Sequence, residues 1–373
     1  MLKILFFRSI ASGILAIVLC APLHLYARSI DIYCNGNVQA DTNQLLQRIA
    51  ASAPGDFTRI HGVCNVNQTV VLFSDRTYEG DSRTGTVIRQ ADNANLPALV
   101  ASDSWANDSS TTGSPVRIAH MTLDGNKASN MDTHALVIRS WLTVIEDMEI
   151  RNAPGDGIRL TNKTKSGVNL TNTSVNGRIS NIFVTGCAGV GIHVVDSGNS
   201  LTDWDLLDSW IASPGQSGIY LENAAGWKIV GNHIYGVRQH AIYANRCYGT
   251  TIADNYIEDF GRDGGEGNTW YGVACTVQGD VGSVIRENKV FNGSSQPATG
   301  IFRFIGIPQV NYGTGVINVI GNVIRGRNTT ADNTALYFRG GSNPLRVMSS
   351  GNQVFSAGTP MTVSDNATLV NGI

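Results

Sequence analysis

The chain alternates short apolar runs with polar corners along most of its length. The apolar runs are four to six residues long, rich in Val, Ile and aromatic side chains, and broken by Gly, Asn and Ser, as in IVGNHIYGVRQ and IADNYIEDFGR. A helix would need apolar residues at i, i+3 and i+4 over ten or more residues, whereas short β-branched runs between turn residues indicate strands. The pattern therefore predicts an all-β fold.

A polar residue at the head of each repeat sets the period. Neighbouring copies lie 23 to 34 residues apart, at His120, Asp147, Asn181, Asp208, Asn232, Asn255, Asn288, Asn322 and Asn352. That spacing indicates a solenoid, since it holds too few strands for a propeller blade. We predict a single-stranded right-handed parallel β-helix whose coils stack about 4.8 Å apart. The recurring polar residues should then occupy the same corner of each coil, where asparagine amides stack into a ladder.

Residues 1–27 read as a secretory signal peptide. Lys3 and Arg8 form the charged start, and residues 10–19 form the apolar core. We therefore expect a secreted or periplasmic protein that matures in an oxidising compartment. No other stretch is apolar and long enough to span a membrane, so we predict no membrane partner.

The rest of the chain divides into a cap and a solenoid. Residues 28–56 are predicted to form an N-terminal cap with a helix over residues 41–53, starting at Asp41 or Thr42 as N-cap. Such a helix would cover the open end of the core. The β-helix should then occupy residues 57–373, with its first strands at 57–66, 69–78 and 86–90 and a polar loop at 105–115.

Five cysteines follow the signal peptide. Cys34 and Cys64 flank the helix, so we expect them to bond and staple the cap. Cys247 and Cys275 lie about one coil apart and would pair if their side chains face each other. Otherwise they, like Cys187, are small buried apolar residues.

Composition narrows the class of partner. Charged residues make up only 15% of the chain, as expected where uncharged Asn, Ser, Thr and Gly make the corners, and the net charge is −2. This balance gives no global basic surface, which argues against a nucleic-acid partner. No terminal cap matching the first is evident, so we expect the last coil to be covered by residues 361–373, by a second subunit in a homo-oligomer, or by residues beyond position 373.

The whole chain after residue 27 resembles the pectate-lyase-like superfamily of secreted right-handed β-helix proteins. The resemblance rests on QADTNQLLQRIAASAPGDFTRIHGVCNVNQTVVLFSDRTYEGD and on the repeats from IAHMTLDGN onward. It implies the fold and a carbohydrate-active or tailspike-like protein. It carries no catalytic residues over, because the paired-Asp signature of polygalacturonases and the Asp-Pro-His run of alginate epimerases are both missing.

The second apolar run of each coil places polar and aromatic side chains outside. Since strand residues alternate faces, Ile158, Ile192, Ile219 and Ile242 should point inward. The residues after them should form one outward stripe, namely Arg159, His193, Tyr220 and Tyr243, with Thr161, Val195, Glu222 and Asn245 beside it. Such a wall suits a long sugar chain, because aromatic rings stack on sugar faces and polar groups orient hydroxyls.

These residues predict a polysaccharide-cleaving enzyme, with a lyase acting on an acidic glycan ahead of a hydrolase. The candidate catalytic residues are His193, Tyr243, Glu222 and His240. The candidate substrate-binding residues are Tyr220, Asn245, Arg238, Arg246, Asp263, Glu266 and Trp270. A lyase needs a base near the acidic carbon and a group that neutralises the carboxylate, whereas a hydrolase needs two carboxylates, Glu222 plus Asp196, Asp263 or Glu266.

Non-catalytic alternatives stay open for the same residues. His240 could cap a turn, Glu222 could pair with Arg246, and Tyr220 and Tyr243 could form a structural stack. The whole stripe could also bind sugar without cleaving it. We predict no cofactor and no metal site, with calcium at Asp203, Asp205 and Asp208 as the alternative, since carboxylate oxygens are the ligands calcium prefers.

Overall fold

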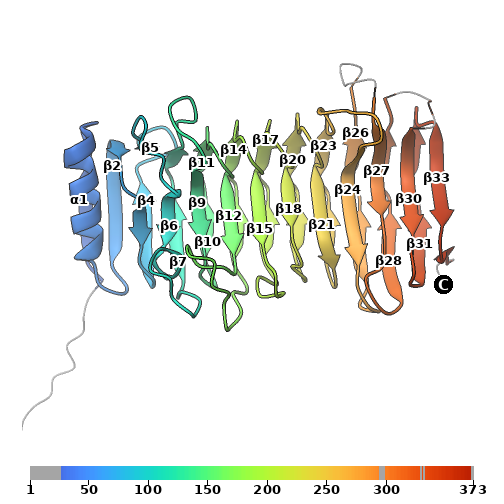
Figure 1. The fold of residues 1–373 in the computed structure, drawn as a ribbon, viewed down its shortest axis with the longest axis horizontal. Coiled ribbons are helices and arrows are strands. Elements are labelled where there is room, and N and C mark those ends of the chain that lie inside the picture. Colours follow the sequence, from blue (N-terminus) through green and yellow to red (C-terminus); the bar gives the residue numbers. More distant parts are fainter. Residues whose placement is uncertain (1–26, 294–298, 328–329, 331, 371–373) are drawn as a thin grey trace, which may run out of the picture.

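The computed structural model is an elongated solenoid that winds along its long axis from the N-terminal helix to the last strands (Figure 1). It describes residues 27–293, 299–327, 330 and 332–370. The predicted signal peptide at residues 1–27 lies outside these described residues except for Ala27. No described helix is both long and apolar enough to cross a membrane.

Each regular coil contributes one strand to each of three parallel sheets, which we name A, B and C. Sheet A contains β1 Ser29–Tyr33, the first half of β2 Phe57–Val66, β4 Arg76–Gly80, β7 Val116–Ala119, β10 Val144–Glu146, β13 Arg178–Ser180, β16 Asp205–Leu207, β19 Lys228–Val230, β22 Thr251–Ala253, β25 Ser283–Arg286, β28 Gly315–Ile320, β31 Leu345–Ser350 and β34 Ala367–Leu369. Sheet B contains the second half of β2, β5 Thr86–Gln90, β8 Thr122–Asp124, β11 Glu149–Arg151, β14 Phe183–Thr185, β17 Trp210–Ala212, β20 His233–Tyr235, β23 Tyr256–Glu258, β26 Lys289–Phe291, β29 Val323–Arg325 and β32 Gln353–Phe355.

Sheet C is the third wall and carries the outward stripe predicted above. It contains β3 Val70–Leu72, β6 Ala98–Ser102, β9 His134–Ile138, β12 Ile158–Thr161, β15 Ile192–Val195, β18 Ile219–Leu221, β21 Ile242–Cys247, β24 Thr269–Val277, β27 Ile301–Ile307, β30 Asn333–Arg339 and β33 Thr359–Ser364. Its central strands stand side by side in Figure 1. The predicted parallel β-helix is therefore confirmed.

One continuous apolar core fills the solenoid. Ile158, Ile192, Ile219 and Ile242 all point into it and are fully buried, as the alternation predicts. Stacking extends to large side chains, since the buried indoles of Trp204 and Trp227 lie one coil apart with ring centroids 5.9 Å from each other.

The corner between sheets A and B holds an asparagine ladder in the later coils. The side-chain amide of each asparagine donates to the carbonyl oxygen of the next, at 2.8 to 3.0 Å. The ladder is formed by Asn232, Asn255, Asn288, Asn322 and Asn352. Because each buried amide finds partners in neighbouring coils, its burial is compensated.

The prediction that all nine polar residues share this position is wrong. The four earlier ones, His120, Asp147, Asn181 and Asp208, lie one residue earlier in the corner and have positive φ angles. The inward position after each of them is filled by Met121, Met148, Ile182 and Ser209 respectively. Asp and Asn are favoured both at a left-handed corner and in a ladder. The predicted set of nine polar residues therefore combines two adjacent positions of the corner, the left-handed position and the ladder position.

The N-terminal helix covers the first coil but starts three residues earlier than predicted. Helix α1 spans Val38–Ala50, and its N-cap is Asn37, whose side chain accepts the N–H of Ala40. The buried Asp41 carboxylate instead accepts three backbone N–H groups at 3.0 Å, from Asn35, Gly36 and Asn65. It therefore ties the helix to strand β2.

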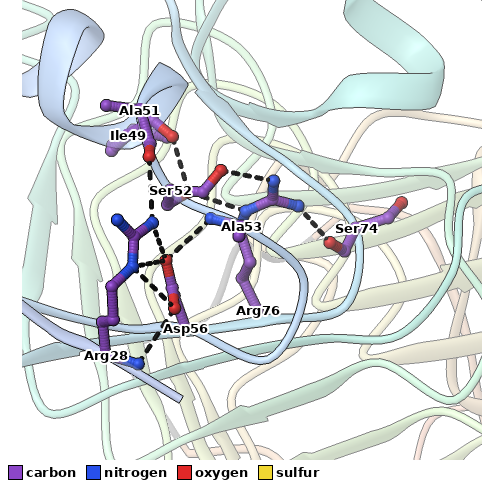
Figure 2. Close-up of polar contacts among 8 residues, drawn as sticks. All are labelled: Arg28, Ile49, Ala51, Ser52, Ala53, Asp56, Ser74 and Arg76. Carbon is purple, nitrogen blue, oxygen red and sulfur yellow. Dashed lines mark hydrogen bonds and ion pairs between the residues drawn. The ribbon is translucent and has the colours of Figure 1, made fainter. Parts of the chain in front are cut away.

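Two arginines hold the C-terminal end of this helix against the first coil (Figure 2). Arg28 forms an ion pair with Asp56 at 2.7 Å and donates to the carbonyl of Ala51. Arg76 donates to both the side chain and the carbonyl of Ser52. The hydrogen bond from Arg28 outweighs the effect of burial and holds the pKa of Asp56 well below its usual range.

Two local predictions in the first coils are corrected. Residues 69–78 form two strands, β3 and β4, because the chain turns from sheet C to sheet A between them, with Asp75 at φ 59°. The loop predicted at residues 105–115 begins inside a short helix, α2 Asp103–Ala106. Its Trp105 is buried in a small apolar cluster on the outside of sheet C.

The cysteine predictions are resolved by two disulfides. Cys34 bonds Cys64 and staples the cap, as predicted. Cys247 bonds Cys275 between β21 and β24 of sheet C. Cys187 is buried and free.

Candidate functional site

Two neighbouring outward columns on sheet C bring the chemically active side chains together. The strand column is the predicted stripe, and its register pairs Arg159 with His193, His193 with Tyr220, and Tyr220 with Tyr243. The second column, which we call the lead-in column, lies at or just before the start of each strand. Its members are His134, Asp156, Val190, Ser217, His240, Tyr271 and Arg303.

Asp156 of the lead-in column joins the two columns through His193 and Arg159. The Asp156 Oδ2 lies 2.9 Å from His193 Nδ1 and also accepts from the Arg159 guanidinium at 2.7 to 2.8 Å. Burial opposes ionisation of Asp156, but the hydrogen bond from His193 and the charge of Arg159 hold its pKa well below the usual range. A carboxylate on Nδ1 fixes the proton there and leaves Nε2 as the free, basic nitrogen.

Two further histidines in the lead-in column accept hydrogen bonds from the backbone. His134 Nδ1 accepts the N–H of Asp156 at 3.0 Å, and His240 Nδ1 accepts the N–H of Tyr271 at 3.1 Å. Burial lowers the pKa of each to about 4. Both rings are therefore neutral near pH 7, with Nδ1 already engaged, as the turn-capping alternative for His240 anticipated.

The two tyrosines of the strand column pack against each other. The rings of Tyr220 and Tyr243 are stacked with centroids 5.2 Å apart, and His193 meets Tyr220 edge-on at 5.6 Å. Their shared faces are covered, so only part of each ring reaches solvent. Burial raises the pKa of both hydroxyls, which stay protonated at neutral pH.

Glu222 extends the site, whereas Arg246 and Asp196, its predicted partners, bond to other groups. The Glu222 Oε1 lies 4.0 Å from His193 Nε2, and its side chain is 40% exposed. Arg246 donates to Asn223 at 2.9 Å instead of pairing with Glu222. Asp196 is buried and accepts the N–H groups of residues 198, 200 and 201, so it is not free to act as a second carboxylate.

Asn245 lies on β21 one residue beyond Ala244, which pairs with Leu221 of β18. The register thus places Asn245 beside Glu222, as the alignment predicted. A register irregularity between Ala244 and Cys247 follows directly. The predicted second stripe therefore ends at this coil.

The loop residues line one edge of the site. Arg238 forms an ion pair with Asp263 at 2.6 Å and, with Arg262, Ser213 and Pro214, borders a hollow of about 330 Å³. Trp270 donates from its indole nitrogen to the carbonyl of Gly264 and lies 5.4 Å from the His240 ring. Glu266 is exposed on the same loop.

A cationic group continues the lead-in column beyond His240. Arg303 donates to the hydroxyl of Tyr271 at 2.7 Å, and its guanidinium lies 3.5 Å from the ring centre of Tyr337. A cation held over an aromatic face keeps its charge while its position is fixed. Fixed arginines therefore stand at the site and further along the wall.

The described part of the chain contains no preformed cluster of metal-ligating side chains. No group of three or more His, Cys, Asp or Glu side chains there could hold a metal ion. In the run proposed for calcium, Asp203 accepts from Thr202, Asp205 pairs with Lys228 at 3.3 Å, and Asp208 lies at the corner with a positive φ angle.

Sequence reasoning missed Asp156, His134 and the role of Arg159. The missed signal is the coil lead-in itself, since PGDGI, AGVGI and GQSGI align Asp156 with Val190 and Ser217. Of this column, only His240 is among the catalytic residues predicted from the sequence. Aligning that column would have placed a carboxylate one coil from His193.

The chain also resembles known proteins in sequence profile and in structure. No curated protein sequence matches it. Its fold superposes on the A-module of a mannuronan C-5 epimerase from Azotobacter vinelandii, at 14% identity and TM-score 0.57, covering 90% of this chain and 96% of that one. It also superposes on PfbA, a surface adhesin of Streptococcus pneumoniae, at 12% identity and TM-score 0.56, covering 90% and 93%.

An alginate lyase from a Paenibacillus species superposes at 12% identity and TM-score 0.51, covering 91% of this chain and 99% of that one. At these identities the likeness concerns the fold alone. The sequence profile described as the right handed beta helix region matches residues 119–324, more than half of the chain. The chain therefore belongs to the right-handed β-helix family.

Proposed function

We propose that the protein is a carbohydrate-active enzyme that cleaves an acidic polysaccharide by β-elimination along the outer face of sheet C. The observation that carries the proposal is the 2.9 Å contact between Asp156 and His193 Nδ1, which leaves His193 Nε2 as an oriented base. A base of this kind is what a lyase needs to remove the proton beside a uronate carboxylate.

The proposed reaction uses residues of the two columns. His193 Nε2 takes the C5 proton, the C5–H electrons form the C4=C5 double bond, and the C4–O glycosidic bond breaks. The leaving oxygen takes a proton from Tyr220 or Tyr243, whose pKa values are raised by burial and which therefore remain donors. This assignment gives the candidate catalytic residue Tyr243 the role of an acid.

Arginine side chains along the wall support an acidic substrate despite the net charge of −2, although Arg238 is itself paired with Asp263. Arg238 and Arg262 border the hollow at the loop edge, and Arg303 stands over Tyr337 further along the wall. Cations placed where a carboxylate must lie also stabilise the negative charge that develops when the C5 proton leaves. Asn245, beside Glu222, is the predicted hydrogen-bond donor to the same group.

We also propose that the protein is exported from the cytoplasm. Residues 1–27 have the pattern of a secretory signal, and the described chain holds two disulfides. Disulfides persist in oxidising compartments. We therefore propose a secreted or periplasmic location.

A hydrolase is the second candidate, favoured by the half-exposed Glu222 carboxylate 4.0 Å from His193 Nε2. Hydrolysis requires a second carboxylate at a suitable separation. With Asp196 held by backbone N–H groups, Asp263 or Glu266 from the loop would have to provide it. A protein that binds sugar without cleaving it is the third outcome to separate.

Incubation with a panel of purified uronate polymers tests the proposal. A lyase gives products that absorb near the ultraviolet edge, and His193→Ala should lower their rate of formation about 10²- to 10⁴-fold. The matched control is His120→Ala, which removes a half-exposed histidine at the corner between sheets A and B.

The other outcomes identify the alternatives. New reducing ends without absorbance, abolished by Glu222→Gln, would establish hydrolysis. Binding without either product would establish a non-catalytic glycan-binding protein.

A further inference from the structure

A second hollow lies on a different wall of the solenoid, on the outside of sheet B. It has a volume of about 430 Å³, within the range of small-molecule sites. Strands β14, β17 and β20 and the corners before them form its floor. Its lining combines aromatic and polar side chains, chiefly Arg83, Asn181, Phe183, Asp208, Trp210 and His233.

An outward column of rings runs through this hollow. Phe183 lies 4.8 Å from Trp210, and Trp210 lies 5.3 Å from His233. The Phe183 ring is tilted by 37° to the indole, which leaves part of the indole uncovered, and Trp210 is 45% exposed. By contrast, Trp204 and Trp227 are fully buried in the core. An exposed indole inside a concave surface is typical of a ligand site.

The charges in this hollow select the class of ligand. Arg83 reaches over from the turn between β4 and β5, donates to the carbonyl of Asn181 and lies 4.0 Å from Asp147. The Asp208 carboxylate forms no hydrogen bond or ion pair with any other side chain in the described part of the chain. The charge of Arg83 thus has Asp147 as its partner, whereas the charge of Asp208 has no partner among the described side chains. A free carboxylate accepts hydroxyl groups and repels an anionic ligand.

We propose that this hollow binds a neutral sugar unit of a glycan, as a second site independent of the sheet C chemistry. His233 stacks on the Trp210 indole with an interplanar angle of 7°, so the exposed edge of the indole contacts the sugar ring, and Asp208 accepts hydrogen bonds from its hydroxyl groups. A neutral sugar fits the free carboxylate, whereas the acidic chain proposed for sheet C does not. The two walls would therefore hold different parts of a mixed glycan or two different glycans.

Calorimetric titration with neutral gluco-, manno- and galacto-hexaose, together with tryptophan fluorescence, tests this site. At least one hexasaccharide should bind and change the fluorescence. Trp210→Ala should weaken that binding about tenfold or more, since a central aromatic contact carries much of the energy of such a site. Asp208→Asn keeps a residue that tolerates the positive φ and should weaken binding by a smaller factor.

Two controls separate this site from other surfaces. Phe355→Ala removes another exposed ring of sheet B, outside the hollow, and should bind the hexasaccharide as the unaltered protein does. His193→Ala should also bind it normally, whatever its effect on polysaccharide cleavage.

Three results would overturn the proposal. One is that no neutral hexasaccharide binds, and another is that Trp210→Ala binds as tightly as the unaltered protein. The third is concentration-dependent self-association that Trp210→Ala abolishes, in the absence of sugar binding, which would assign the face to a second copy of this chain.

Discussion

Sheets B and C carry similar residue types on their outer faces but use them differently. On sheet C, His193 and its neighbours are bonded to one another, with the His193 side chain only 16% exposed and held by Asp156. On sheet B, Trp210 and Tyr256 remain 45% and 37% exposed in a column of packed rings. The solenoid spacing is the same on both walls. The difference is that sheet C orients proton-carrying groups, whereas sheet B offers contact surface.

The largest expected effect is on the orientation of His193. Asp156→Asn should lower turnover on an acidic polysaccharide by about 10²-fold or more, because the amide no longer fixes the Nδ1 proton. KM should change little, since Asp156 positions the base and does not touch substrate. Steady-state kinetics over a range of pH would measure both values and show a shifted pH profile.

Asp280→Asn is the matched control, because this exposed carboxylate lies outside the two columns. It should retain full turnover. An Asp156→Asn protein that keeps the turnover and pH profile of the unaltered protein would remove the distinction between the two walls.

The largely buried side chain of His240 should make the stability of the folded protein sensitive to acid. Burial lowers its pKa from 6.5 to about 4, so between these values the unfolded chain binds a proton that the folded protein does not. Its contribution to stability is fully present above pH 6.5 and is lost as the pH falls towards 4, amounting to about 3 kcal/mol. Urea unfolding at several pH values should show His240→Gln losing less stability than the unaltered protein over this window.

The corresponding control on sheet B is Phe355→Leu, at an exposed ring that carries no titratable group. It should leave the loss of stability between pH 6.5 and 4 unchanged. An equal effect of both substitutions would mean that burial on sheet C is not the cause.

The smallest expected effect concerns two tyrosine hydroxyls. The Tyr243 hydroxyl on sheet C is largely buried and bonds Thr276, so Tyr243→Phe should lower the free energy of unfolding by about 1 kcal/mol. The Tyr256 hydroxyl bonds Glu258 at the surface of sheet B, where solvent competes, and Tyr256→Phe should cost less than about 0.5 kcal/mol. Urea denaturation measures both, and equal costs would contradict the contrast in burial.

Much of the fold follows from local patterns in the sequence. The alternation around Ile158, Ile192, Ile219 and Ile242 places one face inward, and the repeat length fixes which coils are neighbours. These properties are local, so they can be read from the chain. Asp41, predicted as the N-cap, instead accepts the N–H of Asn65 in β2, a contact that the sequence does not reveal, and Asn37 caps the helix.

The candidate site was predictable only in part. The column of His193, Tyr220 and Tyr243 follows from strand alternation and parallel register. The partner Asp156 lies outside the strand, and its approach to His193 depends on how the turn before β12 is folded. Arg246 donates to Asn223 and lies within the register irregularity that follows Ala244. The residue spacing in the sequence does not predict that irregularity.

The asparagine ladder gives the later coils a built-in direction. Every amide from Asn232 to Asn322 donates to the side-chain carbonyl of the following coil and also to a backbone carbonyl of the preceding coil, while its own oxygen receives from the preceding coil. The small dipoles of the amides therefore point the same way along the axis and polarise one another. Removing an amide from the middle, at Asn288, would divide this line in two, whereas removing Asn352 would only shorten it.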